Sequence, residues 1–418
     1  MSLGRRSPAE DDRVRVLLVH NFYRQPGGED RVFATEARLL SERGHQVFTY
    51  EAHNPRENGV AVLRLAGQAF WNQKAYRDLR RLIKEVQPDV VHLHNTFPLI
   101  SPAACYAARR EGVAVVQTLH NYRLICPSGL LFREGRPCEE CVGAFTPWPG
   151  VVHACYRDSH AASLVAGATL AVHRASGTWS RQVNRYIALT RFAREIFIAG
   201  GLPAQSVAIK PNVIHPDPGA GSGDGRFALF IGRLAREKGI DTLVKAWAQV
   251  GHRMPLTIVG DGPLAAEVRR AVAGNPAVTW VGQQPPAVVE ELLGRATCLI
   301  VPSIWYETFG LVVAEAFARG TPVVASRLGA LSELVEDGRT GFHFTPGDAD
   351  DLARRATRFT EYPEAAAAMR VHARAAYERR YAVESNYETL CRIYADAIAS
   401  NVCVTRSRGC RLDGETVR

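Results

Sequence analysis

The sequence lacks the features that mark several large classes of protein. No run reaches the roughly 18 to 20 apolar residues that a membrane-spanning helix needs, and the longest candidate, residues 161–172, fits a buried helix. The N-terminal stretch MSLGRRSPAEDDR is charged and has no apolar segment of the kind found in secretory signals. We therefore expect a cytoplasmic protein.

Long basic runs and zinc-finger spacings are also missing, although the formal net charge is +9. A charge of this sign admits a nucleic acid, an anionic membrane face or a phosphorylated substrate as partner. Because the Lys and Arg residues are spread along the chain, we expect no nucleic-acid partner. The basic amphipathic stretch 65–86 suits peripheral contact with the inner membrane face, but such a stretch more often packs one face on a sheet.

What the sequence does contain is a regular alternation of strand-like and helix-like segments. At 418 residues the chain is longer than a single hydrophobic core usually supports, so two domains are expected. Short β-branched runs recur between helical patterns, among them residues 13–20, 89–94, 113–120, 185–190, 226–232, 256–260, 278–282, 298–303 and 322–326. This alternation predicts an α/β protein with two Rossmann-like, doubly wound parallel sheets whose strand ends face a central cleft.

Changes in composition divide the chain. Residues 1–208 form the predicted first domain, which includes a Cys-rich insertion at about 123–158. Residues 209–226, rich in Pro, Gly and Asp, are predicted to be a linker, and residues 227–382 a second domain. The helical pattern at 383–400 is long enough to cross back to the first domain, and the polar residues 401–418 are expected to be a disordered tail.

Two cations follow the first strand of the second domain. In FIGRLAREKG, Arg233 and Lys238 lie five residues apart, and Gly239 precedes a helix. Cations beside a strand-to-helix turn suit a diphosphate, whose negative charge is compact. The alternative is two solvated side chains at a helix start, but their place at a strand's carboxyl end favours the phosphate role.

A glycine pair occupies the corresponding place in the first domain. Gly27 and Gly28 let the backbone approach a ligand closely and present amide hydrogens to it. A tight turn without a ligand explains the pair equally well. It is not the dinucleotide fingerprint, because no G-x-G-x-x-G follows a strand here, and this argues against a nicotinamide enzyme.

Two glutamates flank a helix start in SIWYETFGLVVAEAFARG. The sequence predicts a strand, then a loop holding Glu307, then a helix that holds Glu315 and ends at Gly320. The loop also brings the amides of Thr308, Phe309 and Gly310 to the helix N-terminus, which favours anion binding. Because carboxylates accept hydrogen bonds from vicinal hydroxyls, a sugar and a ribose are plausible ligands on either side of that site.

Together these segments resemble glycosyltransferase family 4, a family of retaining enzymes with the GT-B fold. GRLAREKG, VGDGPL and the two glutamates in E-x7-E spacing are similar to the family's motifs and follow its order, and the resemblance covers roughly residues 14–398. Pro211-Asn212-Val213 departs from the Pro-Asn-Gly that is common in the family between the domains.

The resemblance also implies roles for individual residues. Glu307 would bind hydroxyls of the donor sugar and Glu315 the nucleotide ribose, while Arg233 and Lys238 hold the diphosphate. The Gly27–Gly28 pair would lie close to that diphosphate, and His120 matches a histidine near the reacting sugar. We also expect backbone contacts around Gly282 to recognise the base.

Four cysteines fall in the insertion. Cys126, Cys138, Cys141 and Cys155 give the spacing C-x11-C-x2-C-x13-C. Disulfides are rare in a cytoplasmic protein, and four thiolates around one C-x2-C can bind structural zinc. Only one of the usual two C-x2-C knuckles is present, so free thiols in an inserted loop are the alternative.

The sequence therefore predicts a hexosyltransferase that moves a sugar from a nucleotide-diphosphate donor, such as a UDP- or GDP-sugar, to an acceptor hydroxyl. The acceptor would be a glycan, a lipid-linked glycan or a small molecule. Asp348-x-Asp350 fits an N-capped helix start better than a metal site, so no catalytic metal or other cofactor is expected. The alternatives are a nucleotide-sugar epimerase on the same fold and a non-catalytic nucleotide-sugar binding protein.

Overall fold

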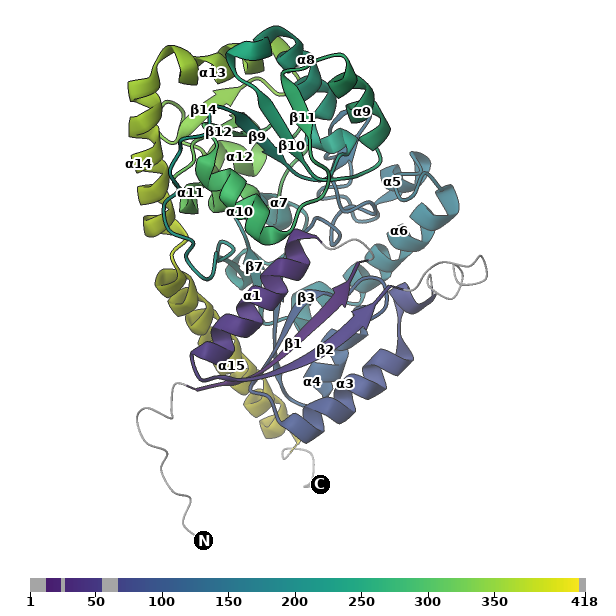
Figure 1. Cartoon of the computed structure of the whole chain (residues 1–418). Helices are drawn as coiled ribbons and strands as arrows, with labels where there is room; N and C mark the ends of the chain where they lie inside the picture. Colours follow the sequence, from purple (N-terminus) through teal and green to yellow (C-terminus); the bar gives the residue numbers. More distant parts are fainter. Residues whose placement is uncertain (1–12, 24–26, 55–66, 413–418) are drawn as a thin grey trace, which may run out of the picture.

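Two six-stranded parallel sheets form the two halves of the molecule (Figure 1). The computed structural model describes residues 13–23, 27–54 and 67–412, with side chains as far as Asn401. The first sheet has the strand order β2-β1-β3-β4-β7-β8. Its strands are β1 (Arg15–Phe22), β2 (Gln46–His53), β3 (Val90–Asn95), β4 (Ala114–Thr118), β7 (Arg185–Ala188) and β8 (Val207–Ile209).

Both faces of the first sheet are covered, which explains its continuous apolar strands. Val16 and Leu18 of β1 point into one hydrophobic core, whereas Leu17 and Val19 point into the other. The helices that cover the faces include α1 (Gly28–Glu42), α3 (Gln73–Val86), α4 (Ala103–Arg110) and α7 (Arg191–Ala199), whereas α6 (His160–Ala175) packs outside the sheet.

The second sheet repeats this design with the order β11-β10-β9-β12-β13-β14. Its strands are β9 (Ala228–Ile231), β10 (Leu256–Val259), β11 (Val278–Trp280), β12 (Cys298–Val301), β13 (Val323–Ser326) and β14 (Gly341–Phe344). Its helices are α8 (Ile240–Val250), α9 (Ala265–Ala273), α10 (Pro286–Arg295), α11 (Leu311–Ala318), α12 (Gly329–Leu334), α13 (Ala349–Glu361) and α14 (Pro363–Arg380). The predicted pair of doubly wound parallel sheets is confirmed.

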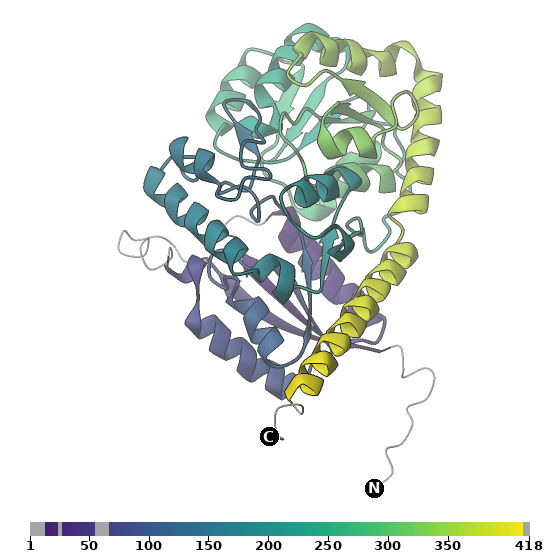
Figure 2. The same ribbon diagram turned by 180° about the vertical axis from the view of Figure 1, so that it is seen from behind.

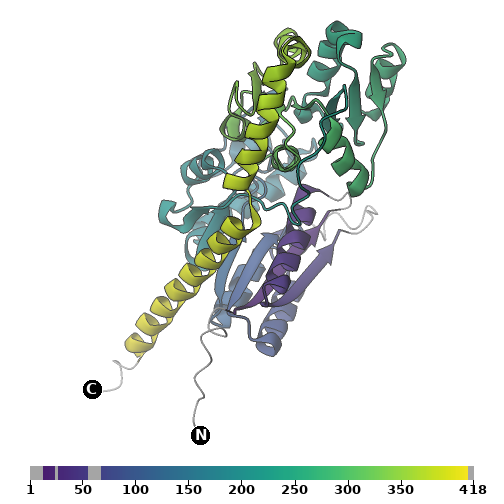
Figure 3. The ribbon, with the colours of Figure 1, turned by 60° about the vertical axis from the view of Figure 1, so that its left-hand side comes forward.

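A long C-terminal helix returns to the first domain. Helix α14 belongs to the second half, and α15 (Val383–Leu412) then runs along the first half, as Figures 2 and 3 both show. Its Tyr394 hydroxyl lies 2.8 Å from Nδ1 of His92 on β3. The predicted crossing helix is thus confirmed, but it ends at Leu412 rather than at 400. The expectation of disorder from 401 onward is therefore wrong as far as Leu412, and residues 413–418 lie outside the described part.

The predicted linker and insertion contain little regular structure. No helix or strand lies between Ile209, the last residue of β8, and Ala228, the first residue of β9. The insertion holds a two-stranded antiparallel hairpin, β5 (Phe132–Arg133) and β6 (Arg136–Pro137), followed by the short helix α5 (Trp148–Val152). It lies near the junction of the two halves, beside α6 (Figure 1).

Two further sequence predictions can be compared with the structure. Asp348 accepts a hydrogen bond of 2.9 Å from the amide of Asp351, so the predicted N-cap of α13 is confirmed. Helix α3, in the basic stretch proposed for membrane contact, buries Ala75, Leu79 and Ile83 within the protein; residues 55–66 lie outside the described part. In the described chain, no helix combines the length and apolar character that crossing a bilayer requires.

Candidate active site

The predicted donor residues lie where the strand order of the second sheet reverses. The chain proceeds from β9 to β10 and β11 on one side and returns to place β12 on the other. Arg233 and Lys238 follow β9, and Glu307 follows β12. Ligands of open α/β sheets bind in the crevice at such a switch point. The first sheet has its own switch point between β1 and β3, where Gly27 and Asn95 are found.

Gly239 allows close contact between the β9–α8 turn and the β12–α11 loop, which hold the predicted donor residues. Its φ of +71° is left-handed, and an added Cβ would lie 1.8 Å from the carbonyl oxygen of Pro302, so only glycine fits. Beside it, the amide of Ile304 donates to the carbonyl of Glu237 at 2.9 Å. The β9–α8 turn and the β12–α11 loop are therefore held together as one surface.

Lys238 and Glu307 meet on that surface. The Lys238 ammonium lies 2.6 Å from Oε1 of Glu307, which also accepts a 2.8 Å hydrogen bond from Ser303. Lys238 Nζ stands 5.2 Å from the centre of the Trp305 ring. Arg233 is exposed, and no carboxylate of the described chain pairs with it. The loop thus offers two cations, one held in place by a buried carboxylate and one unengaged.

The N-terminus of α11 adds backbone donors. Gly310 precedes it with a φ of +95°. Among residues with described contacts, the amides of Thr308, Phe309 and Gly310 donate to no acceptor. A Cβ added to Gly28 would touch Leu311 at 3.6 Å, so the N-termini of α1 and α11 face each other across the junction of the domains. Unused amides at a helix N-terminus form an anion site.

Glu315 occupies a separate position. It lies inside α11, is nearly buried, and forms an ion pair with Arg31 of α1 in the other domain. Burial raises the pKa of its carboxyl, and Arg31 opposes this effect. Because Glu307 contacts Lys238 and Ser303 instead, the two glutamates share no partner. Their expected separation into two binding positions agrees with this geometry.

The glycine pair and Gly282 take part in backbone contacts of their own. The amide of Gly27 donates to Oδ2 of Asp30 at 2.7 Å at the start of α1, and Oδ1 of Asp30 lies 2.6 Å from Nε2 of His20. The amide of Gly27 is therefore engaged within the helix, contrary to the expectation that both glycines present amides to a ligand. Gly282, with a φ of +71°, accepts a 2.8 Å bond from the amide of Gly260, and its α-carbon faces open space.

His120 ends a chain of buried polar side chains. Its Nε2 lies 3.1 Å from Nδ1 of His94, and Nε2 of His94 lies 3.4 Å from Oε2 of Glu36. Glu36 Oε1 accepts a 2.5 Å bond from the ammonium of Lys210, which stands at the start of the interdomain segment. Burial, followed by the neighbouring His94, lowers the pKa of His120 well below its usual value. His120 is therefore a neutral imidazole whose ring is positioned by His94.

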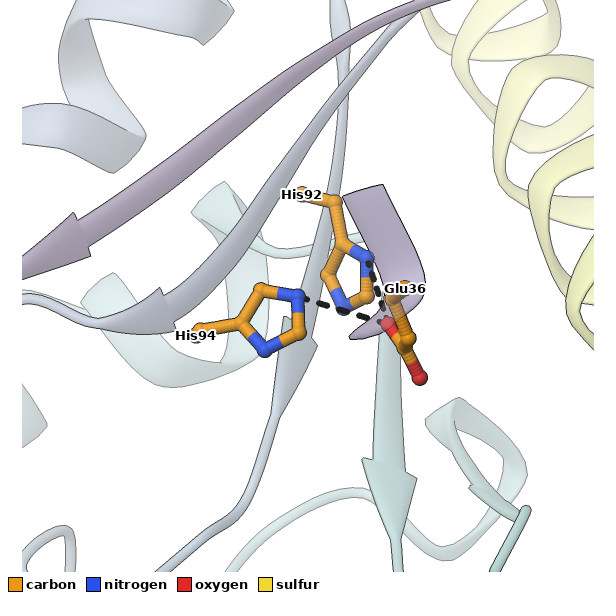
Figure 4. A group of neighbouring side chains, drawn as sticks. All are labelled: Glu36, His92 and His94. Atoms are coloured by element: carbon orange, nitrogen blue, oxygen red, sulfur yellow. Dashed lines mark ion pairs between the residues drawn. The ribbon is translucent and has the colours of Figure 1, made fainter. Parts of the chain in front are cut away.

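Glu36, His92 and His94 are spaced like metal ligands (Figure 4). One ligand atom from each lies within 4.8 Å of the other two. The ammonium of Lys210 already neutralises Glu36, however, and His92 contacts Tyr394 and Thr118 through its two ring nitrogens, each at 2.8 Å. We interpret the group as a buried ion pair with histidine partners. Sequence reasoning missed Glu36 and Lys210, since an isolated lysine in a Pro-Asn segment carries no signal.

A cavity opens from His120 into the first domain. Most of its lining is apolar. The residues that face it from β3, β4, α6 and the intervening loops include His94, Asn95, Phe97, His120, Asn121, Arg123, Leu170 and Trp179. A largely apolar pocket with a few convergent polar groups is the usual form of a small-molecule site.

Glu29, in the first turn of α1, is a third residue that sequence reasoning missed. Its two carboxylate oxygens lie 3.5 Å from the amide nitrogens of Asn95 and Asn121. Burial, with a smaller contribution from the adjacent Asp30, raises the pKa of Glu29 to about 8. At neutral pH the carboxyl is therefore largely protonated and able to donate a hydrogen bond. An acid directly after Gly-Gly at a helix start was the available signal.

The raised pKa of Glu29 predicts a specific pH dependence of stability. Between the ordinary pKa of 4.5 and about 8, the folded protein retains a proton that the unfolded chain has released. The free energy of unfolding therefore falls as pH rises through this window. Glu29→Gln should remove this loss, so its stability advantage over wild type should grow by about 2 kcal/mol as pH rises from 6 to 8, measured by urea unfolding. Exposed Glu85→Gln is the control, and parallel pH curves for Glu29→Gln and wild type would contradict the assignment.

The four cysteines of the insertion line a second, smaller cavity. Cys126 and Cys141 are buried, Cys138 and Cys155 are half-buried, and none of the four forms a disulfide. The cavity lies apart from the donor residues, and its lining shares no residue with the cavity beside His120.

Two family models match the chain in succession. The one described as Glycosyltransferase Family 4 matches residues 26–218, and the one described as Glycosyl transferases group 1 matches residues 217–376. Together they span the first sheet, the interdomain segment and the second sheet.

Individual relatives are more distant. An uncharacterised 42.6 kDa protein from the cps region of Klebsiella pneumoniae is 24% identical over 77% of this chain and 87% of its own length. The D-inositol 3-phosphate glycosyltransferase of Pseudarthrobacter chlorophenolicus is 43% identical, over 30% of this chain and 32% of its own length. The chain thus matches about a third of the length of that second relative.

The fold itself has solved counterparts. HepE of Anabaena, whose crystal structure holds UDP-glucose, superposes with a TM-score of 0.66 at 18% identity, over 93% of this chain and all of that one. The two matched models and the paired parallel sheets lead to one conclusion. The chain belongs to the glycosyltransferases of family 4 and has their two-domain GT-B fold.

Proposed function

We propose that the protein transfers a hexose from a nucleotide-diphosphate sugar to an acceptor hydroxyl, with retention of the anomeric configuration and without a catalytic metal. The observation that carries the proposal is the cluster at the switch point of the second sheet. There Arg233, Lys238 and the unused amides of Thr308 to Gly310 converge beside Glu307. HepE, of the same fold, was crystallised with UDP and with UDP-glucose, which favours a uridine donor.

In this proposal the C-terminal domain holds the donor and the first domain holds the acceptor. The diphosphate lies on Arg233, Lys238 and the N-terminus of α11. Glu307 accepts hydrogen bonds from hydroxyls of the transferred sugar, and Glu315 from those of the ribose. The base rests near Gly282, where the absence of a side chain leaves open space.

The acceptor enters the cavity beside His120. Its hydroxyl oxygen forms the new bond to the anomeric carbon while the bond from that carbon to the phosphate oxygen breaks. The hydroxyl proton passes to the departing phosphate on the same face of the sugar. Preorganised cations and amides stabilise the charge that develops on the diphosphate. His120, neutral because it is buried, accepts or donates a hydrogen bond near the transferred sugar.

Nucleotide binding provides the first test of this function. UDP at about 100 times its dissociation constant should stabilise the protein by about 2.7 kcal/mol, which a thermal-shift panel of UDP, GDP, ADP and dTDP would detect. Arg233→Ala should reduce the shift because it removes a diphosphate contact. Arg236→Ala is the matched control, since Arg236 is exposed in the same turn. Failure of every nucleotide to stabilise the protein would contradict the proposal.

Product analysis separates transfer from its alternatives. The donor is the diphosphate sugar of whichever nucleotide stabilises the protein, and it is offered with a panel of acceptors. NMR of the product should show that the transferred sugar keeps the anomeric configuration it had in the donor. A donor isomer formed without acceptor would indicate an epimerase instead. Tight donor binding with no release of nucleotide diphosphate, in the presence or absence of acceptors, would indicate a binding protein.

A further inference from the structure

Left-handed backbone conformations are concentrated in the segment of the described chain that surrounds the four cysteines. Seven non-glycine residues of the described chain have a positive φ, and five of them lie between Cys126 and residue 158. These five are Leu131, Glu134, Ala154, Arg157 and Asp158. A left-handed conformation costs such residues roughly 1 to 2 kcal/mol each. Regular structure in this segment is limited to the hairpin β5–β6 and the five-residue α5, so few ladder or helix hydrogen bonds offset this cost.

All four cysteines face the same cavity. Cys126, Cys138, Cys141 and Cys155 line it together with mainly apolar neighbours. Two of the sulfurs already have hydrogen-bonding groups beside them. The hydroxyl of Ser128 lies 3.2 Å from Sγ of Cys126, and the backbone amide of Gly150 hydrogen-bonds to Cys141. Hydrogen bonds around a sulfur ligand belong to the outer shell that orients the ligands of a metal site.

The charge around the cavity is also suited to an anionic cluster. Arg133 and Glu140 both line its wall and form an ion pair of 2.6 Å with each other, while the half-buried guanidinium of Arg174 lies near Cys141. Arg174 hydrogen-bonds to the backbone oxygens of Ala144, Phe145 and Gly200, and no described carboxylate pairs with it.

We propose that Cys126, Cys138, Cys141 and Cys155 bind one structural Zn²⁺ ion that fixes the insertion. Binding forms four Zn–S bonds and releases four protons, and the resulting cluster carries a charge of −2 that the nearby guanidinium of Arg174 partly balances. Zn–S bonds of about 2.3 Å place the sulfurs close together. Within the described chain, only Glu36, His92 and His94 bring three ligand atoms within 4.8 Å, so the cysteine side chains must turn inward to bind the ion.

The zinc site would also stabilise the β12–α11 loop, which holds Glu307. Glu139 lies between Cys138 and Cys141, and its carboxylate accepts a 2.7 Å hydrogen bond from the hydroxyl of Tyr306, the residue before Glu307. On the other side of the cavity, Cys126 closes a turn that begins at Tyr122. The hydroxyl of Tyr122 lies 3.4 Å from the carbonyl of Glu307. A metal that fixes both segments holds the first domain against the β12–α11 loop.

Metal analysis of the full chain tests the proposal directly. Protein purified without an affinity tag should carry one equivalent of zinc by atomic emission. Cys138→Ser/Cys141→Ser should lose it, whereas Cys298→Ala, at a buried thiol of β12, should retain it. Less than a tenth of an equivalent, with no uptake when zinc is supplied during refolding, would overturn the proposal.

Two measurements on the wild-type protein remain decisive if the double variant fails to fold. Replacement of the metal by Co²⁺ should give the thiolate-to-metal charge-transfer bands and the intense visible bands of a tetrahedral thiolate site. Thiol titration of the denatured, metal-stripped chain should detect all nine cysteines without reductant. A count that rises on reduction would indicate disulfides and overturn the proposal. Neither readout depends on transferase activity, so the zinc site and the proposed function fail or succeed separately.

Discussion

Replacing Lys238 by alanine is expected to lower kcat/KM for sugar transfer by about 10²- to 10³-fold, the usual cost of losing one preorganised donor to a developing anion. The ammonium of Lys238 is fixed 2.6 Å from Glu307 and close to the Trp305 ring. It therefore needs little reorganisation when charge accumulates on the diphosphate. The measurement is steady-state release of the nucleotide diphosphate in the presence of acceptor.

The control for this variant is a lysine on the neighbouring helix. Lys245 of α8 is exposed, and Lys245→Ala should leave kcat/KM unchanged. Lys238→Arg should recover only part of the rate, because the planar guanidinium does not reproduce the compact ammonium. Since the loss of Lys238 also leaves Glu307 without its cation, folding of each variant must be verified by thermal unfolding. Full activity of a folded Lys238→Ala protein would show that the donor site has been assigned wrongly.

Local patterns made the donor side of the protein predictable from sequence. The strands that carry Arg233 and Glu307 are short apolar runs, and the residues of interest follow them directly. Parallel strands bring their carboxyl ends to one edge, so sequence order alone placed these side chains near each other.

The parts that sequence reasoning missed depend on tertiary contacts. Strands β8 and β14 are short, and β14 begins with glycine, so neither produces a strand-like run. The pairing of Lys210 with Glu36 joins residues 174 positions apart, and neither residue has a local pattern around it. The pKa of Glu29 follows from its burial beside Asn95 and Asn121, which no residue spacing reveals. The sequence beyond Ser400 was predicted to be a disordered tail because it is polar and has no clear apolar face that would stabilise a helix.

Replacing Lys210 by methionine is expected to lower the free energy of unfolding by about 3 to 5 kcal/mol, the cost of removing one partner from a buried ion pair. Both side chains of the Lys210–Glu36 pair are 1% exposed. Without Lys210, Glu36 would be an uncompensated charge beside His92 and His94. Urea unfolding at pH 7 measures the loss. Lys84→Met, at an exposed pair with Glu111, should change stability by less than about 0.5 kcal/mol.

The pH dependence of the stability lost in Lys210→Met shows whether the charge of Glu36 causes that loss. In the wild type, burial acts to raise the pKa of Glu36, but Lys210, with His94 and His92, outweighs it and holds the pKa well below the usual value. The pair therefore contributes stability above pH 4.5, and that contribution is lost as pH falls through the depressed folded pKa. In Lys210→Met, burial prevails and Glu36 takes up a proton at higher pH. The difference between variant and wild type should thus be largest at neutral pH and narrow toward pH 5.

A double variant separates the charge from the side-chain volume. Glu36→Gln/Lys210→Met contains no buried charge at this position, so it should recover much of the stability lost in Lys210→Met. The neutral amide that replaces the carboxylate can still hydrogen-bond to His94, so transferase activity should recover with stability if Glu36 acts only by holding His94 and His120 in place. If stability returns and activity does not, the carboxylate itself polarises the His94–His120 pair, and Glu36 is a positioning residue for the reaction as well as half of an ion pair.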